Sequence, residues 1–208
     1  MKLTADRIVD AALAVHAEHG LRGLSMRAVA TRLDAQAGSL YYHVPDKAAL
    51  LRLLADRIAH EAHDAGTSAL AELADATDWQ ASVTAQASAL RATLRRRAGG
   101  AELLASAPAV ASTGALRLLE RLLTTLTDAG LTRRDAGTVA DTVLGYVTGF
   151  VLQEQAEHGA DAESDPQAWA RLRTSFPVTF DDAAGEDDDV TFARGLALLC
   201  AGAATLTP

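Results

Sequence analysis

Apolar residues recur every three to four positions along most of this chain, which is the spacing of helices with one buried face. Near the N-terminus, Ile8, Ala12 and Val15 define such a stripe. They predict a helix over residues 3–20, with Thr4 as its N-terminal cap and a glycine at its end.

The same periodicity, interrupted by glycine, proline and capping residues, predicts the remaining helices. They span residues 25–33, 37–43, 46–65, 78–97, 112–129, 132–158 and 189–206, with a short helix starting at 165–166. Ser25 and Asp46 are expected to cap the helices that they begin. The basic run at 95–97 is attributed to the dipole of a helix end. Residues 181–189 are acidic and are expected to form a solvated loop. Neither a strand pattern nor an internal repeat is present, so the sequence predicts an all-α fold.

Two of the short helices are separated by a turn of three residues, 34–36, and follow the longer first helix. This is the plan of a helix-turn-helix, whose second short helix enters the major groove of DNA. Small residues at the start of that helix, Ala37, Gly38 and Ser39, let its backbone approach DNA, and its positive N-terminal end attracts phosphate.

Larger side chains around the same helices carry groups that reach DNA. Tyrosine hydroxyls, a histidine ring and a lysine suit phosphate oxygens, whereas an arginine can also bind a guanine edge. The complete predicted DNA-binding set is Ser25, Arg27, Ala37, Gly38, Ser39, Tyr41, Tyr42, His43 and Lys47. Tyr42 has an equally good alternative, which is to pack beneath the recognition helix.

Charge supports a DNA-binding role only weakly. The 208-residue chain has a net charge of −8; residues 1–50 carry six basic and five acidic side chains, and the remainder carries 13 and 22. The single cysteine, Cys200, cannot form an internal disulfide, which favours the cytoplasm. The polar N-terminus does not resemble a signal peptide, and the apolar run at 196–206 is too short to span a membrane, so no membrane association is expected.

The motifs LSMRAVA, at 24–30, and GSLYYHVPDKAAL, at 38–50, resemble the signature of the TetR family of bacterial repressors. Asp34 stands where that family usually has glycine, and aspartate tolerates the left-handed turn conformation. Residues 144–155 and 192–202 also resemble the last two long helices of the tetracycline-repressor branch.

The resemblance implies a helix-turn-helix DNA-binding domain at 1–48 and a ligand-binding and dimerisation domain at 49–208. It further implies a homodimer that binds a double-stranded palindromic operator and is released by a small-molecule effector. In this branch the last two long helices of both subunits form a four-helix bundle. The expected interface residues are Gly145, Gly149, Leu196, Leu199 and Ala203.

The resemblance also suggests where an effector would bind. The positions that correspond to drug contacts in this branch are His63, Gln86, Leu90, Leu104, Leu122 and Gln153. In the branch the drug arrives as a magnesium chelate, yet Leu104 stands at the metal-binding histidine position and Gln153, beside Glu154, at the carboxylate position. Leucine cannot ligate magnesium, which prefers oxygen. We therefore expect a largely apolar effector, bound without metal, and no cofactor.

Several alternatives remain open at this stage. A transcriptional activator or a regulator without an effector fits the sequence nearly as well as a repressor. His60 and His63, one helical turn apart, suit a transition metal but also an ordinary solvated pair. Catalysis is not expected, because no carboxylate is placed to orient His43 beside Ser39.

Overall fold

The computed structural model describes residues 3–106, 112–157, 171, 173–177 and 187–207, and within these ranges every regular element is an α-helix. The helices are α1 (Ala5–Gly23), α2 (Met26–Arg32), α3 (Ala37–Tyr41), α4 (Lys47–Ala71), α5 (Trp79–Arg95), α6 (Gly100–Ala105), α7 (Thr113–Asp128), α8 (Arg133–Glu157) and α10 (Asp188–Ala204). In the described part of the chain, none of them has the length and apolar character needed to cross a membrane. The all-α prediction is confirmed.

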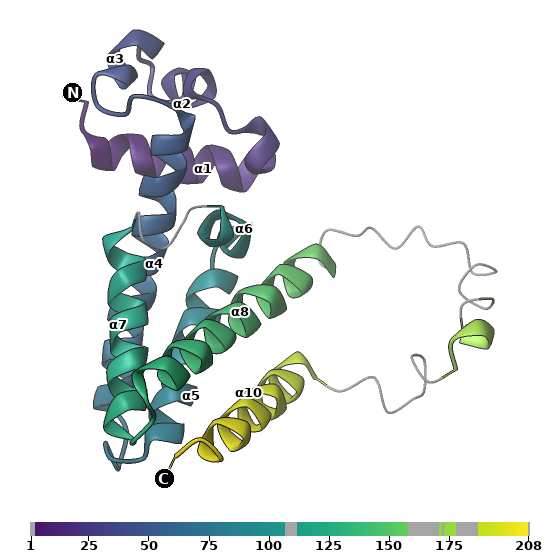
Figure 1. The fold of residues 1–208 in the computed structure, drawn as a ribbon. Helices are drawn as coiled ribbons and strands as arrows, with labels where there is room; N and C mark the ends of the chain where they lie inside the picture. Colours follow the sequence, from purple (N-terminus) through teal and green to yellow (C-terminus); the bar gives the residue numbers. More distant parts are fainter. Residues whose placement is uncertain (1–2, 107–111, 158–170, 172, 178–186, 208) are drawn as a thin grey trace.

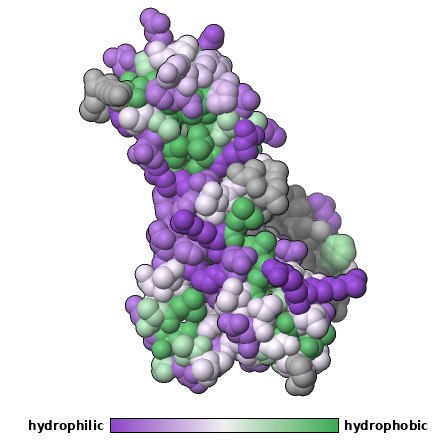
Figure 2. All heavy atoms as spheres, turned by 60° about the vertical axis from the view of Figure 1, so that its left-hand side comes forward, coloured by the Kyte–Doolittle hydropathy of each residue, from purple (hydrophilic) through white to green (hydrophobic). Residues whose placement is uncertain are grey.

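Helices α1–α3 form a small head around the start of α4, and the other helices form a larger body (Figure 1). The predicted caps are present. Oγ1 of Thr4 accepts a hydrogen bond from the backbone N of Arg7 (3.3 Å), and Oγ of Ser25 accepts one from Ala28 N (3.1 Å). Figure 2 shows that head and body meet at a narrower neck where hydrophilic residues gather, while hydrophobic side chains form patches on the body.

Two backbone positions shape the head. Asp34, between α2 and α3, has φ +50°, so the aspartate adopts the left-handed conformation for which the family uses glycine. Gly20 has φ +63° and interrupts the regular helix where its end was predicted, and a further helical turn follows this kink up to Gly23. The chain therefore makes one further helical turn after Gly20 before α2 begins.

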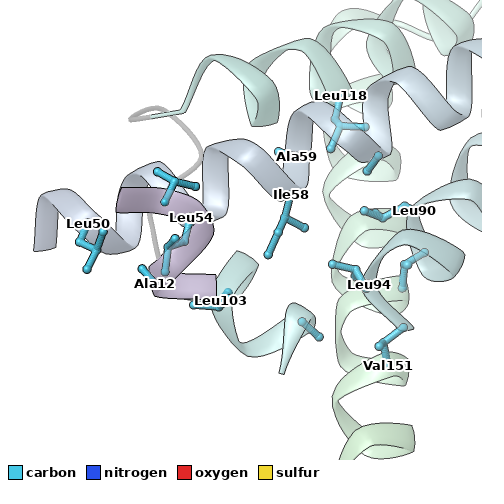
Figure 3. Packing of buried hydrophobic residues seen from close by; sticks show 14 of the residues in the cluster. Ala12, Leu50, Leu54, Ile58, Ala59, Leu90, Leu94, Leu103, Leu118 and Val151 are labelled. Carbon is cyan, nitrogen blue, oxygen red and sulfur yellow. The ribbon is translucent and has the colours of Figure 1, made fainter. Parts of the chain in front are cut away.

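Helix α4 passes from the head into the body and contacts α1, α5, α6 and α7. Figure 3 shows Leu50 and Leu54 on the side of α4 where Ala12 of α1 lies, and Ile58 farther along the same helix. The predicted end at residue 65 is wrong, because α4 runs to Ala71. Gly66 does not break the helix but is buried against α7, where even a Cβ atom would lie 2.2 Å from Nη2 of Arg121.

Helix α6 was not predicted, because six residues are too few to show a helical period. The preceding Gly99, with φ +65°, turns the chain sharply, and Leu103 then enters the core near α4 (Figure 3). Helices α8 and α10 lie side by side on the body (Figure 1). The short helix expected from 165 and most of the acidic segment 181–189 lie outside the described residues.

Candidate DNA-binding and effector sites

The recognition surface of the head is well exposed. Tyr41 is 50% exposed and Tyr42 is 89% exposed, so Tyr42 does not pack beneath the recognition helix. Helix α3 ends at Tyr41, two residues before the predicted end, and Leu40 and Val44 hold it from below with no exposed surface. The two tyrosines and His43 therefore face outward together, as a DNA-contacting surface requires.

The small residues at the start of α3 leave room for a close backbone approach. A Cβ atom at Gly38 would meet no heavy atom within 4 Å, and Gln36 makes no side-chain capping bond there. Ser25 is used as the cap of α2, and Arg27, two residues later, is exposed. Nζ of Lys47 donates a hydrogen bond to the carbonyl of Leu21 (3.2 Å) and keeps two further N–H donors.

The body contains a cavity of about 740 Å³ between α4, α5 and α7. Its lining residues are His63, Leu70, Ala76, Thr77, Trp79, Ser82, Arg117, Glu120, Arg121, Thr124, Thr125, Asp128 and Ala129. On α7, Arg117, Arg121, Thr124 and Asp128 recur at helical spacing, so one polar face of that helix forms a wall. The volume lies within the range of small-molecule sites.

The six predicted effector contacts do not converge on this cavity. His63 lines it, and Gln86 is buried just behind its wall, where Nε2 donates to Oγ1 of Thr125 (3.1 Å) and Oε1 accepts from Nε of Arg121 (2.9 Å). Leu90 and Leu122 are core residues with 2% and 3% of their surface exposed.

The other two predicted contacts lie elsewhere. Leu104 lines a separate cavity of about 300 Å³, together with Gly145. Gln153 is exposed, whereas the neighbouring Glu154 is buried and faces Arg91. Of the six positions, His63 therefore lines the main cavity, and the role of all six in effector binding stays a prediction.

A partly buried ionic network joins α5, α8 and α10, and no sequence pattern indicated it. Oε2 of Glu154 accepts a hydrogen bond from Nε of Arg91 (3.3 Å), and Nη1 of Arg91 lies 2.7 Å from Oδ1 of Asp189. The Arg91 guanidinium also stacks over the ring of Phe192, at 4.5 Å. The hydrogen bond from Arg91 holds the pKa of Asp189 below its ordinary value.

Two expectations about charged residues are corrected by these contacts. Asp189 was assigned both to the end of a solvated loop and to the start of the last helix. It lies in the first turn of α10 and pairs with Arg91 and Arg95, so the assignment to a solvated loop is wrong. The basic run at 95–97 was attributed to the dipole of the helix end. Instead, Nη2 of Arg97 lies 2.6 Å from Oε1 of Glu61, so this run ties α5 to α4 by an ion pair.

The predicted dimer residues fall into two groups. Leu196 and Ala203 are buried inside the subunit, with 1% and 3% exposed, because α10 turns that face toward α8. Gly145 and Gly149 have open space above them, and Leu199 is half-buried. The outer face of α10 instead presents Leu198, which is 75% exposed, next to alanine and glycine.

The magnesium chemistry of the branch does not fit the residues present. Leu104 supplies no ligand, Glu154 is engaged by Arg91, and no cluster of three or more potential metal ligands exists within the described ranges. Nδ1 of His60 lies 3.0 Å from the carbonyl of Asp56, whereas His63 faces the cavity. The histidine pair is therefore divided between two environments.

A helix-turn-helix head with exposed tyrosines, carried by a helical body with a cavity, defines the class of bacterial DNA-binding regulators. Residues 8–54 match the family model of bacterial regulatory proteins of the tetR family, and residues 73–207 match that of the tetracyclin repressor-like C-terminal domain. The chain belongs to the TetR family.

Similar proteins agree with this placement. The tetracycline repressor protein class A from transposon 1721 of Escherichia coli is 31% identical over 98% of this chain and 91% of its own. The repressor DrrR1 of Streptomyces coeruleorubidus is 32% identical over 80% of this chain, and the match spans 60% of its length.

Similar solved structures include one protein in complex with a small molecule and one in complex with its DNA operator. The Streptomyces coelicolor protein ActR in complex with (S)-DNPA superposes with a TM-score of 0.78, at 26% identity and with 98% of each chain covered. BioQ with its double-stranded DNA operator superposes with a TM-score of 0.69, at 28% identity, covering 98% of this chain and 99% of its own.

Proposed function

We propose that this chain is a transcriptional repressor that binds a palindromic operator as a homodimer and leaves it when a small molecule enters the body. The observation that carries the proposal is the continuity of α4. Lys47 begins this helix at the recognition surface, and His63 and Leu70 of the same helix line the cavity. BioQ bound to its operator and ActR bound to (S)-DNPA are similar proteins in the two corresponding states.

The effector acts through its different affinity for two arrangements of the dimer. In the DNA-bound arrangement the two recognition helices lie about 34–36 Å apart, which is one turn of DNA. A ligand that displaces the cavity end of α4 changes this spacing, because the helix is unbroken between the two sites. The apolar part of the cavity lining, which includes Leu70 and Trp79, suits a mainly apolar effector, and we propose that it binds without metal.

The proposed dimer contact uses the outer faces of α8 and α10. Gly145 and Gly149 allow close approach, and Leu198 is a large apolar side chain that a partner would cover. Leu196 and Ala203 are excluded from this contact because they are already buried within one subunit. We place the dimer in the cytoplasm and assign it no catalytic activity.

Operator selection from a random duplex library, followed by fluorescence anisotropy with the recovered sequence, tests the DNA-binding half of the proposal. Substituting Tyr41→Ala or Lys47→Ala should weaken binding to all sequences, and Lys47→Ala should also lower the salt slope by about one. Arg27→Ala should relax base preference by about 1–3 kcal/mol at one position. Unchanged operator binding by all three variants would contradict the docking surface.

The repressor half of the proposal needs a separate measurement. A reporter gene placed behind the selected operator should be silenced by the protein and restored by an effector. Activation of the reporter by the protein alone would identify an activator instead. The matched control is Arg133→Gln, an exposed residue at the start of α8, which should change neither DNA binding nor silencing.

A further inference from the structure

Arg121 is the innermost charged side chain of the main cavity, and all its described hydrogen-bond acceptors are neutral. Nε donates to Oε1 of Gln86 (2.9 Å), and Nη1 donates to the carbonyl of His63 (2.6 Å) and to Oγ1 of Thr67 (2.8 Å). The described contacts of Arg121 include no carboxylate. A full positive charge is therefore held in the wall of the cavity by uncharged groups.

Two other partly buried arginines of the body form ion pairs with carboxylates. Arg91 pairs with Glu154, and Arg97 pairs with Glu61. Burial lowers the pKa of the Arg121 guanidinium, and the carboxylate that acts against this effect, Asp64, has a side chain that is 79% exposed. Burying a charge without a counter-charge is costly, so Arg121 is poised for an anion that the described part of this chain does not supply.

One nitrogen of Arg121 has no acceptor at all. Nη2 is buried and makes no hydrogen bond in the described structure. It fits there only because position 66 is glycine, since a Cβ atom would lie 2.2 Å away. A ligand in the cavity would gain Nη2 as a donor if the guanidinium turned away from Gly66. The bond from Nη1 to Thr67 could be exchanged in that turn, because Thr67 is exposed and can bond water instead.

The other charges around the cavity lie nearer to solvent. Arg117, Glu120 and Asp128 of α7 line it, but all three are exposed residues, so water screens them. The elements opposite contribute no carboxylate to the lining: α4 gives His63 and Leu70, and α5 gives a tryptophan and a serine. The inner wall is thus cationic beside an aromatic surface, while the rim is mixed.

We propose that this cavity recognises an organic anion, with a carboxylate on the guanidinium of Arg121 and an apolar remainder against Trp79 and Leu70. A guanidinium can donate two parallel N–H···O bonds to a carboxylate. A neutral group of the same shape, such as a carboxamide, does not fit this arrangement equally well. The inference rests on the proposed function, since it names the chemical class of the effector of that same cavity.

The test compares aromatic carboxylates with their carboxamides, such as 2-naphthoate with 2-naphthamide, in a panel of increasing size. The full-length chain carries two tryptophans, so a Trp169→Phe background makes Trp79 the fluorescence reporter at the cavity. At least one carboxylate should bind ten-fold or more tightly than its amide, a difference of about 1.4 kcal/mol. Arg121→Met should bring this ratio to about one, and Arg121→Lys should retain part of it.

The ratio within each variant is the readout because a loss of stability would weaken both probes alike. Arg133→Gln, at an exposed residue at the start of α8 that does not line the cavity, should keep the wild-type ratio. The proposal is overturned if no carboxylate of the panel binds more tightly than its amide, or if the preference survives in Arg121→Met.

Operator binding separates this proposal from the function on which it rests. A carboxylate that binds through Arg121 and leaves DNA affinity unchanged supports the anion site and contradicts the effector role of the cavity. A neutral compound that enters the cavity and releases DNA, when no carboxylate does so, supports the effector role and overturns the anion site.

Discussion

Glu154 should be one of the most costly polar residues to replace in this protein. Its side chain is 5% exposed, that of Arg91 is 8% exposed, and the two are joined by a pair of hydrogen bonds. Glu154→Gln preserves the shape and one acceptor but removes the negative charge. The buried guanidinium of Arg91 then keeps only Asp189, whose side chain is 69% exposed, as a counter-charge.

The expected loss follows from this geometry. Removing one member of a buried ion pair costs about 3–5 kcal/mol, because the remaining charge stays in the interior. Because Arg91 keeps its contact with Asp189, the loss of unfolding free energy in Glu154→Gln should lie near the lower end of this range, at about 3 kcal/mol. For a chain of this size, each kcal/mol of lost stability lowers the melting temperature by about 2–4 °C. The melting temperature of Glu154→Gln should therefore fall by roughly 6–12 °C.

Urea denaturation followed by circular dichroism measures the change, at one protein concentration because dimerisation is linked to folding. Glu120→Gln, an exposed carboxylate on α7, is the control and should stay within about 0.5 kcal/mol of wild type. The double variant Arg91→Met, Glu154→Leu should recover most of the loss, since no unpaired charge remains. A Glu154→Gln variant within 1 kcal/mol of wild type would refute the reasoning.

Three further predictions follow from the same structure. Gly99→Ala should lower stability by about 1–3 kcal/mol in thermal denaturation, because its φ is +65° and its Cβ would lie 2.4 Å from Cε1 of His16. Because Arg91 lowers the pKa of Asp189, the contribution of this carboxylate is complete above the unfolded pKa of about 3.9 and is lost as the pH falls through the lower folded value. Asp189→Asn should therefore flatten the acid limb of the stability profile. Leu198→Glu should yield folded monomers in light scattering, because this exposed leucine lies on the proposed dimer face.

Each of these has a matched comparison. Gly137→Ala, in α8 with open space above it, should be neutral or stabilising by up to about 1 kcal/mol. Leu116→Glu changes another exposed leucine, on α7, and should leave the dimer intact. Equal losses at Gly99 and Gly137, an unchanged acid limb in Asp189→Asn, or dimeric Leu198→Glu would each show the corresponding argument to be wrong.

Much of the helical plan follows from local signals in the sequence. Thr4, Ser25 and Asp46 were predicted as caps and all three accept the expected backbone hydrogen bonds. Gly66 misled the prediction because its role is set by a side chain 55 positions away, Arg121. A local pattern cannot distinguish a glycine that ends a helix from one that makes room for a distant partner.

The two candidate sites also differ in how far a local sequence pattern could predict them. The recognition surface lies within one short stretch of chain, and its motif could be read directly. The main cavity lies between three helices that are distant in the sequence. The position of Arg121 in its wall therefore depends on how α4, α5 and α7 pack, which a local sequence pattern does not indicate. The one available signal was the polar stripe from Arg117 to Asp128 along the apolar helix α7.

The sharing of α4 between head and body also bears on how the molecule unfolds. Leu50 and Leu54, on the first turns of α4, have no exposed surface and close the underside of the head, so a fragment ending at residue 48 would lose part of its own core. We therefore expect that the head does not fold independently of α4. Amide hydrogens of α1 and of the central part of α4 should exchange in one cooperative event. Changes deep in the body, such as those at Glu154, should thus be felt as lost protection in the DNA-binding head.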